Sequence, residues 1–181
     1  MIVQTLLDCV SEGEVPTAKR LAERAGVSER SIFVHFRDLD DLRLAAAEAQ
    51  YETVVAMLRP VDPALPLTER IGLLVAQREL IFLAQGPRLI GLLEAHRSKA
   101  LADWIARVDA DLRAQVEDVF AAELDEWSGD DRDELLGALD ATAAWAFRQH
   151  LCATMGWSPQ RASRTVARTL SAILGGYGST S

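Results

Sequence analysis

The sequence predicts an all-α fold of about nine helices, and three observations carry that prediction. Alanine and leucine, which favour helices, number 28 and 25, against 13 valines and 7 isoleucines, which favour strands. Apolar residues recur at intervals of three and four, and no stretch alternates as a half-buried strand would. Glycines and prolines punctuate the chain between the predicted helices. The 181 residues are enough to bury a substantial core.

Three short helices and one long one are expected first, at about residues 2–12, 17–24, 28–36 and 38–58. Gly13 and Gly26 are expected to end the first two, because glycine readily adopts the left-handed conformation found after helix C-termini. Thr17 and Ser28 precede the second and third helices, where a hydroxyl can accept a hydrogen bond from an unpaired backbone amide.

Prolines at 60, 63 and 66 mark a loop, and five more helices are expected after it, at about residues 68–85, 88–96, 98–124, 131–155 and 159–174. Gly86-Pro87 is expected to separate the helices at 68–85 and 88–96. Ser128-Gly129 is expected to interrupt the chain before the helix at 131–155. Ser158-Pro159 predicts the start of the last helix, since a serine cap followed by proline is a common helix opening. Glycines at 175, 176 and 178 predict a frayed tail.

Membrane and secreted proteins are not expected. The longest apolar run, at residues 71–76, has about six residues, whereas a membrane helix needs about 20. Thr5 and Asp8 interrupt the N-terminal apolar residues, so we expect no signal peptide. Cys9 and Cys152 form neither a disulfide framework nor a metal-ligand spacing, so a cytoplasmic protein without a metal site is expected.

An enzyme is not expected either. The sequence has no Gly-rich phosphate loop, no nucleophile elbow, no HExxH motif and no Cys/His cluster. Paired acids such as Asp130 and Asp131 lie in an acidic stretch that is expected to be solvated. We therefore expect neither catalysis nor a cofactor.

The net charge of −8 argues, for the chain as a whole, against a general nucleic-acid binder. The charge is unevenly distributed, however, because residues 117–134 hold nine acidic residues and one basic residue. Residues 15–37 instead hold five basic and two acidic residues, a local charge of +3 of the kind that phosphate contacts need. The five basic residues are Lys19, Arg20, Arg24, Arg30 and Arg37.

Residues 17–36, TAKRLAERAGVSERSIFVHF, predict two short helices that meet at a tight turn. Gly26 permits the positive φ that the turn needs, and Ala22 is small where the helices approach closely. The pattern is typical of a helix-turn-helix, whose second helix enters the DNA major groove. A plain helical hairpin with a solvated basic face is the alternative. The apolar residues expected to hold the two helices together are Leu21, Val27, Ile32 and Phe36.

Four short motifs match a known signature. They are Leu21-Ala22, Ala25-Gly26-Val27-Ser28, Phe33-Val34-His35-Phe36 and Asp40-Asp41-Leu42. Through them, about residues 1–50 resemble the TetR family of bacterial transcriptional regulators. The segment TAAWAFRQHLCATMGWSPQRASRTVARTLSAIL resembles the last two helices of that family more loosely. We expect a helix-turn-helix DNA-binding domain over residues 1–45, and a helical ligand-binding and dimerisation domain over residues 46–181.

The resemblance implies DNA contacts from the second and third helices. Thr17 and His35 would contact phosphate, although His35 has the alternative of packing on Phe36 at the surface. Arg30 is the best candidate for a bidentate contact with guanine. The expected DNA-binding residues are Thr17, Lys19, Ser28, Glu29, Arg30, Ser31, Phe33, Val34, His35 and Arg37.

The helix expected at 131–155 is apolar almost all round, which is typical of a helix buried on both sides. Together with the last helix it predicts a two-fold homodimer that binds a palindromic operator, in agreement with the resemblance. A core helix in a monomer is the alternative. The expected interface residues are Trp145, Arg148, Cys152, Val166, Leu170 and Ile173.

Aromatic and polar residues of the second domain predict a small-molecule pocket, with ordinary core positions as the alternative. The resemblance implies an inducer site there. An unidentified effector would favour a conformation in which the DNA-reading helices no longer fit the operator. The expected pocket residues are Phe82, Gln85, His96, Trp104, Phe120, Trp145 and Gln149.

The predicted function is sequence-specific transcriptional regulation by a homodimer that binds double-stranded DNA, with repression as the family default. The alternative is a helical protein-interaction module with the same fold that has lost DNA binding. Phe33 and Leu39 favour this alternative, because the family usually carries there a tyrosine and a lysine that can bind phosphate.

Overall fold

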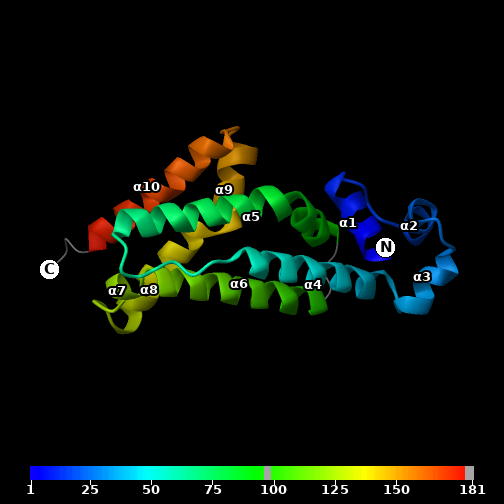
Figure 1. Cartoon of the computed structure of the whole chain (residues 1–181), viewed down its shortest axis with the longest axis horizontal. Coiled ribbons are helices and arrows are strands. Elements are labelled where there is room, and N and C mark those ends of the chain that lie inside the picture. The colour runs from blue at the N-terminus through cyan, green and yellow to red at the C-terminus, as the bar shows by residue number, and fades with distance from the viewer. Residues whose placement is uncertain (96–98, 178–181) are drawn as a thin grey trace. The chain divides into compact units, whose positions relative to one another are not determined.

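The fold is all-α, as predicted. The computed structural model describes residues 1–95 and 99–177, without the side chains of 85–95, 100, 101 and 177, and these residues contain no strand (Figure 1). The helices are α1 (Ile2–Ser11), α2 (Ala18–Ala25), α3 (Glu29–His35), α4 (Leu39–Met57), α5 (Leu67–Ala95), α6 (Lys99–Val119), α7 (Ala121–Leu124), α8 (Gly129–Ala143), α9 (Trp145–Gln149), the π-helical turn η1 (His150–Thr154) and α10 (Pro159–Tyr177).

Packing divides the chain into two compact units. The first consists of Met1–Met57 and Leu83–Val108, and the second of Leu58–Phe82 and Asp109–Ser181. The domain boundary predicted after residue 45 falls inside α4 and stays a prediction. No helix in the described part of the chain is both long and apolar enough to cross a membrane.

In the first unit, α1 packs against α2 and α4, and α2 packs against α3. The side chains between these helices are apolar and almost fully buried, and burying such side chains is the main contribution to stability. The predicted starts and ends of the short helices are confirmed by the caps at Thr17 and Ser28 and by positive φ angles at Gly13 and Gly26. The largest fully buried side chains of these helices are Leu6, Leu7, Leu21, Ile32 and Leu42.

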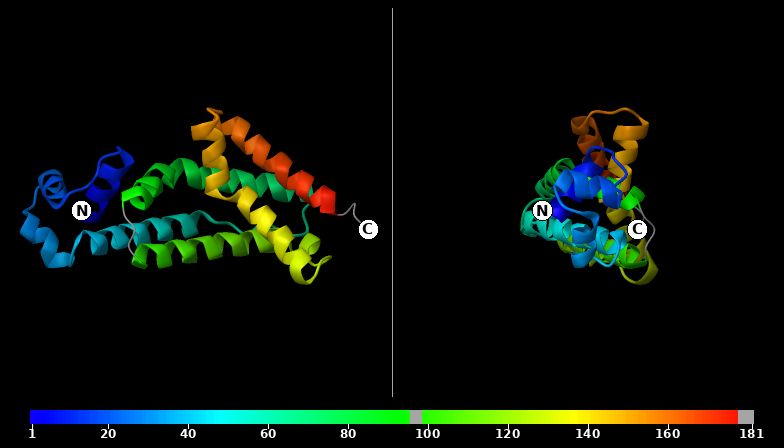
Figure 2. Two further views of the ribbon diagram at one scale, coloured as in Figure 1. Left: turned by 180° about the vertical axis from the view of Figure 1, so that it is seen from behind. Right: turned by 90° about the vertical axis from the view of Figure 1, so that its right-hand side faces the viewer.

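In the second unit, α10 packs along α8, and a sharp bend separates α8 from α9 (Figure 2). The core brings together residues from α5, α6, α8 and α10. Phe120 belongs to this core and is fully buried. Pro159 begins α10, which confirms the predicted helix start at Ser158-Pro159.

Two predicted helix bounds in the middle of the chain are wrong. α5 continues through Gly86-Pro87 to Ala95, so one helix replaces the two expected at 68–85 and 88–96. A proline inside a helix costs about 3 kcal/mol, which the apolar stripe of a long helix can offset. The helix expected at 98–124 is interrupted at Phe120, where the freed Val119 carbonyl accepts a hydrogen bond from Arg70.

Two further corrections concern the C-terminal helices. The helix expected at 131–155 begins at Gly129 and breaks at Ala144, whose backbone is extended with φ −70° and ψ 153°. This break turns Trp145 toward Phe82, so that the two rings meet edge-on at 4.9 Å. The expected frayed tail is also wrong in part, because α10 stays helical through Gly175 and Gly176 to Tyr177.

Candidate functional site

The turn between α2 and α3 is tight, and a glycine and one backbone hydrogen bond determine its conformation. Gly26 ends α2 with φ +66°, in the left-handed region that glycine adopts without strain. The Val27 amide then donates to the Ala22 carbonyl at 3.0 Å, which closes the turn. Ala22 is buried where the helices approach, and Ile32 of α3 is fully buried. Through these contacts α3 packs against α2, and its opposite face is exposed to solvent.

That outer face of α3 carries the residues expected to read DNA. Phe33 is 46% exposed and Val34 is 71% exposed, so this face presents two apolar side chains to solvent. Arg30 lies on the same exposed surface. All ten expected DNA-binding residues belong to this unit, and nine of them are exposed, with Ser31 half-buried.

The hydroxyl residues at the helix starts already have structural partners. Thr17 Oγ1 accepts a hydrogen bond from the Arg20 amide at 3.2 Å, and Ser28 Oγ accepts one from the Ser31 amide at 3.1 Å. The Ser28 and Ser31 hydroxyls also lie 2.8 Å apart. Thr17 and Ser28 therefore act as helix caps. The Thr17 hydroxyl keeps a proton suited to a phosphate oxygen, and the Ser28–Ser31 pair keeps one such proton between its two hydroxyls.

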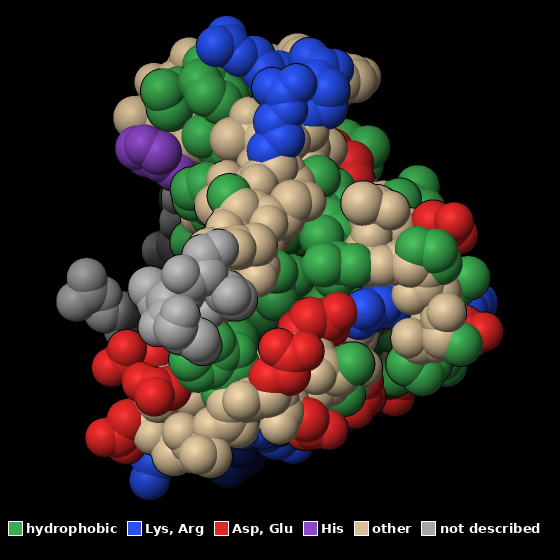
Figure 3. Space-filling model, turned by 90° about the vertical axis from the view of Figure 1, so that its left-hand side faces the viewer, with side chains coloured by type: hydrophobic (Ala, Val, Ile, Leu, Met, Phe, Trp, Pro, Cys, Tyr) green, Lys and Arg blue, Asp and Glu red, His purple; other side chains and the backbone are tan. Residues whose placement is uncertain are grey.

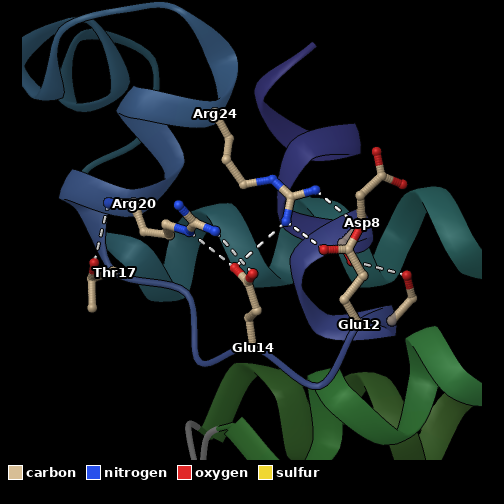
Figure 4. A network of polar contacts seen from close by, with 7 residues as sticks. Asp8, Glu12, Glu14, Thr17, Arg20 and Arg24 are labelled. Carbon is tan, nitrogen blue, oxygen red and sulfur yellow. Dashed lines mark hydrogen bonds and ion pairs between the residues drawn. The ribbon is translucent and has the colours of Figure 1, made fainter.

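Two of the five basic residues are held by acids that precede the positively charged window. Arg20 donates to Glu14 from Nε at 3.1 Å and from Nη2 at 3.0 Å (Figure 4). Arg24 donates to Glu12 from Nη1 at 2.6 Å and from Nη2 at 3.0 Å. The guanidinium groups of Arg24 and Arg20 hold the pKa values of Glu12 and Glu14, respectively, below their usual range.

A third basic residue is also paired. Arg37 donates to Asp41 at 3.1 Å from Nη2 and, through its backbone amide, at 3.1 Å again. Among the described residues, the other two basic residues of this window, Lys19 and Arg30, form no ion pair. Sequence reasoning missed this because Glu12 and Glu14 lie just outside residues 15–37, although their closeness in sequence was a usable signal.

The residues expected to line a pocket do not gather in one place. Phe82 and Trp145 are in contact in the second unit, where Phe120 is fully buried in the core. Trp104 belongs to the first unit and meets Tyr51 edge-on at 6.4 Å. Gln149 is half-buried in the second unit. The Gln85 side chain and the whole of His96 lie outside the described part of the chain.

The residues expected at a dimer interface differ in exposure. Arg148, Val166 and Leu170 are buried within the chain itself, and Leu170 has no exposed surface. Trp145, Cys152 and Ile173 are half-buried. The homodimer stays a prediction.

A small hollow, open to solvent and with enclosed space of only about 10 Å³, lies in the second unit between α5, α8, α9 and α10. Of the expected pocket residues Phe82 lines it, and so do Arg148 and Val166, which were expected at the interface. Sequence reasoning missed Arg78, although a charged residue seven positions after Ile71 and four after Leu74 lies on an apolar helix face, which is a signal. The full lining is Val75, Arg78, Glu79, Phe82, Ala143, Ala144, Arg148, Ser163 and Val166.

The charge of the second unit is also segregated. Seven of the nine acids in residues 117–134 are exposed, around α7 and the start of α8. Figure 3 shows one face of the molecule, with acidic side chains in its lower half and a group of basic side chains at its top. The exposed basic residues of α10 are Arg161, Arg164 and Arg168.

The described part of the chain is all-helical, and α3 presents an exposed face. No protein-family model matches the chain, and no significant match is found among the curated proteins or among the solved structures.

Proposed function

We propose that this protein is a sequence-specific DNA-binding transcriptional regulator of the TetR type, in which α3 enters the major groove. The single observation that carries the proposal is the outer face of α3, which is exposed on a helix fixed by the Gly26 turn. Arg30 lies on that face without an ion pair among the described residues, so its guanidinium is available for the two acceptors of a guanine edge.

Phosphate contacts in this proposal come from residues around α3. Lys19 supplies a charge, and the Thr17 and Ser28 hydroxyls can donate to phosphate oxygens. His35 is exposed at the end of α3. With few unpaired cations, the protein should bind DNA weakly and its affinity should change little with salt, because the salt dependence rises with the number of neutralised phosphates.

A homodimer completes the proposed function. A single α3 covers too few base pairs for specific binding, and two copies related by a two-fold axis would read a palindrome whose half-sites are about 34 Å apart. A small-molecule effector would then release the protein from DNA by favouring a different spacing of the two helices.

A protein-interaction module is the second candidate, and one observation favours it. Phe33 and Val34 give α3 an exposed apolar surface, while Arg20 and Arg24 are held by acids. An apolar exposed helix face is typical of protein recognition.

Selection of genomic DNA fragments by the purified full chain, followed by sequencing, tests the proposal. At low salt, a regulator enriches fragments that share one palindromic sequence. The absence of any enriched sequence would contradict the proposal and favour the interaction module. Light scattering at micromolar concentration tests the dimer separately. A regulator that reads a palindrome should have the molar mass of two copies of the chain.

A further inference from the structure

Three arginines lie along the outer face of α10. Arg161, Arg164 and Arg168 follow one another at intervals of three and four residues, which places them on one side of the helix. All three are exposed, and none forms an ion pair with another described residue. The Arg161 guanidinium is held against the Trp157 ring, with Cζ 3.9 Å from the ring centroid. These three residues form an arginine stripe that is paired with no described carboxylate.

The outer face of α8 carries the opposite charge near its start. Asp130, Asp133 and Glu134 are exposed, and they form no ion pair with another described residue. The helix dipole favours acids at the start of a helix, but this effect fades within one turn. It explains Asp130, which lies in the first turn, and not Asp133 or Glu134. The acidic face of α8, which consists of these three residues, is therefore larger than the start of a helix requires.

The arginine stripe and the acidic face lie toward opposite ends of one helix pair. α10 packs along α8 and runs back toward its start, so that the end of α10 lies near the start of α8 (Figure 2). The stripe occupies the first half of α10, whereas the acids occupy the first two turns of α8. The two sets of charges are therefore not placed to pair with each other within one chain.

A second copy of this chain offers the matching charges. A two-fold axis perpendicular to the helix pair reverses its direction, so the acidic end of one copy meets the basic end of the other, and the contact forms twice. Ala141 and Ala172 are exposed on the same two faces, and their small side chains let helices approach closely. A parallel arrangement would instead bring like charges together, which opposes association.

We propose that the arginine stripe of α10 binds the acidic face of α8 in a second copy of the chain. The opposite charges then determine the antiparallel arrangement of the two copies and exclude partners that lack this pattern. The proposal rests on the homodimer of the proposed function, and it names the side chains that determine how the two copies recognise each other. It does not rest on DNA binding.

Two charge-reversed variants of the full chain test the pairing. Arg164→Glu, Arg168→Glu and, separately, Asp130→Arg, Asp133→Arg should each raise the Kd of the dimer by about tenfold or more, because every contact between copies becomes repulsive. An equimolar mixture of the two variants should form heterodimers, since the reversed residues of one variant match those of the other. Native mass spectrometry separates the heterodimer from both homodimers by mass. A role of these residues within one chain cannot produce this rescue, so a mixture without heterodimers would overturn the proposal.

A matched control and a salt series complete the test. Lys99→Glu, Arg107→Glu reverses two exposed charges of α6 and should leave the Kd unchanged. For the wild type, sedimentation equilibrium should show a Kd about tenfold higher at about 500 mM salt than at about 50 mM, because salt screens exposed charges. A dimer that is insensitive to salt and to charge reversal would overturn the pairing alone, even if one variant did not fold. A wild type that stays monomeric up to about 100 μM would overturn the proposed homodimer as well.

Discussion

Arg24 of α2 and Glu12 at the end of α1 form an ion pair in which Nη1 and Oε2 are 2.6 Å apart. The neighbouring pair of Arg20 with Glu14 has the same form, at 3.0 Å. Both acids precede the window of residues that carries the local positive charge, and both arginines lie within it. The surface of α2 and α3 therefore has fewer unpaired cations than its sequence indicates.

Removing these two acids should strengthen DNA binding. The double variant Glu12→Gln, Glu14→Gln frees Arg20 and Arg24 for phosphate oxygens. The slope of log K against log salt should become steeper by up to about 1.8, or about 0.9 for each added contact. Fluorescence anisotropy with the selected duplex over a salt series measures this slope.

The matched control is Asp125→Asn, Glu126→Gln, which changes the net charge equally at two exposed positions of the second unit. Equal tightening by both double variants would mean that net charge, and not the pairing of Arg20 and Arg24, determines the effect.

Gly26→Ala should destabilise the first unit. Gly26 has φ +66°, and a Cβ there is strained even though no atom lies within 4 Å of it. The expected cost is about 1–2 kcal/mol, seen as a lower thermal midpoint by circular dichroism. Gly137→Ala, in the middle of α8 with open space around it, should instead stabilise by about 0.5–1 kcal/mol. A Gly26→Ala variant as stable as the wild type would contradict the turn geometry.

Arg78→Met should raise the free energy of unfolding of the ligand-free protein. Burial lowers the pKa of Arg78, so the charged form is less favourable in the folded state than in the unfolded one. This penalty is fully present at pH 7, below both pKa values, and is relieved only as the pH rises through about 10. The expected gain at pH 7 is about 1–3 kcal/mol in denaturant unfolding. A loss of similar size would show that the hydrogen bond from Arg78 Nη2 to the Leu112 carbonyl outweighs the buried charge.

Glu79→Gln should make the protein less stable at neutral pH and less sensitive to acid. The Arg148 guanidinium beside Glu79 holds the pKa of that carboxyl below its usual range, and the Ser163 hydroxyl acts in the same direction. A lowered carboxyl pKa stabilises the fold above the usual value near 4.3, and this contribution is lost as the pH falls through the folded-state pKa.

The variant should therefore be about 1–3 kcal/mol less stable at pH 7, and the difference should narrow below about pH 4. Denaturant unfolding at pH 7 and pH 3.5 measures both values. The exposed Glu126→Gln is the control, and its difference from the wild type at pH 7 should be near zero. If the difference in unfolding free energy between Glu79→Gln and the wild type did not change with pH, the ion pair between Glu79 and Arg148 would be contradicted.

Local signals in the sequence predicted the parts of the fold that local chemistry determines. Thr17, Gly26 and Ser158-Pro159 act on their immediate neighbours, so their caps and turns follow from the residues themselves. Two other features do not follow from neighbouring residues. They are the continuation of α5 through Gly86-Pro87 and the break at Ala144. The residues that follow the extended Ala144 contact α5, a helix distant in sequence, and no local pattern signals these contacts.

The candidate site shows the same division. The exposure of α3 could be predicted, because a seven-residue helix that buries Ile32 on one face leaves its other faces in solvent. The pairing of Arg20 and Arg24 depended on how the α1–α2 connection folds. The hollow around Arg78 depended on three segments far apart in the chain, and its charged wall had no local pattern beyond one arginine on an apolar face.

The central claim is that α3 reads DNA bases. The most direct test is to select genomic fragments with three proteins in parallel: the wild type, Arg30→Ala and Lys19→Ala. Arg30→Ala should lose preference at one base pair of each half-site, at a cost of about 1–3 kcal/mol, while Lys19→Ala weakens binding to all sequences alike. The account would be contradicted if the wild type enriched no shared sequence, or if Arg30→Ala selected the wild-type sequence unchanged.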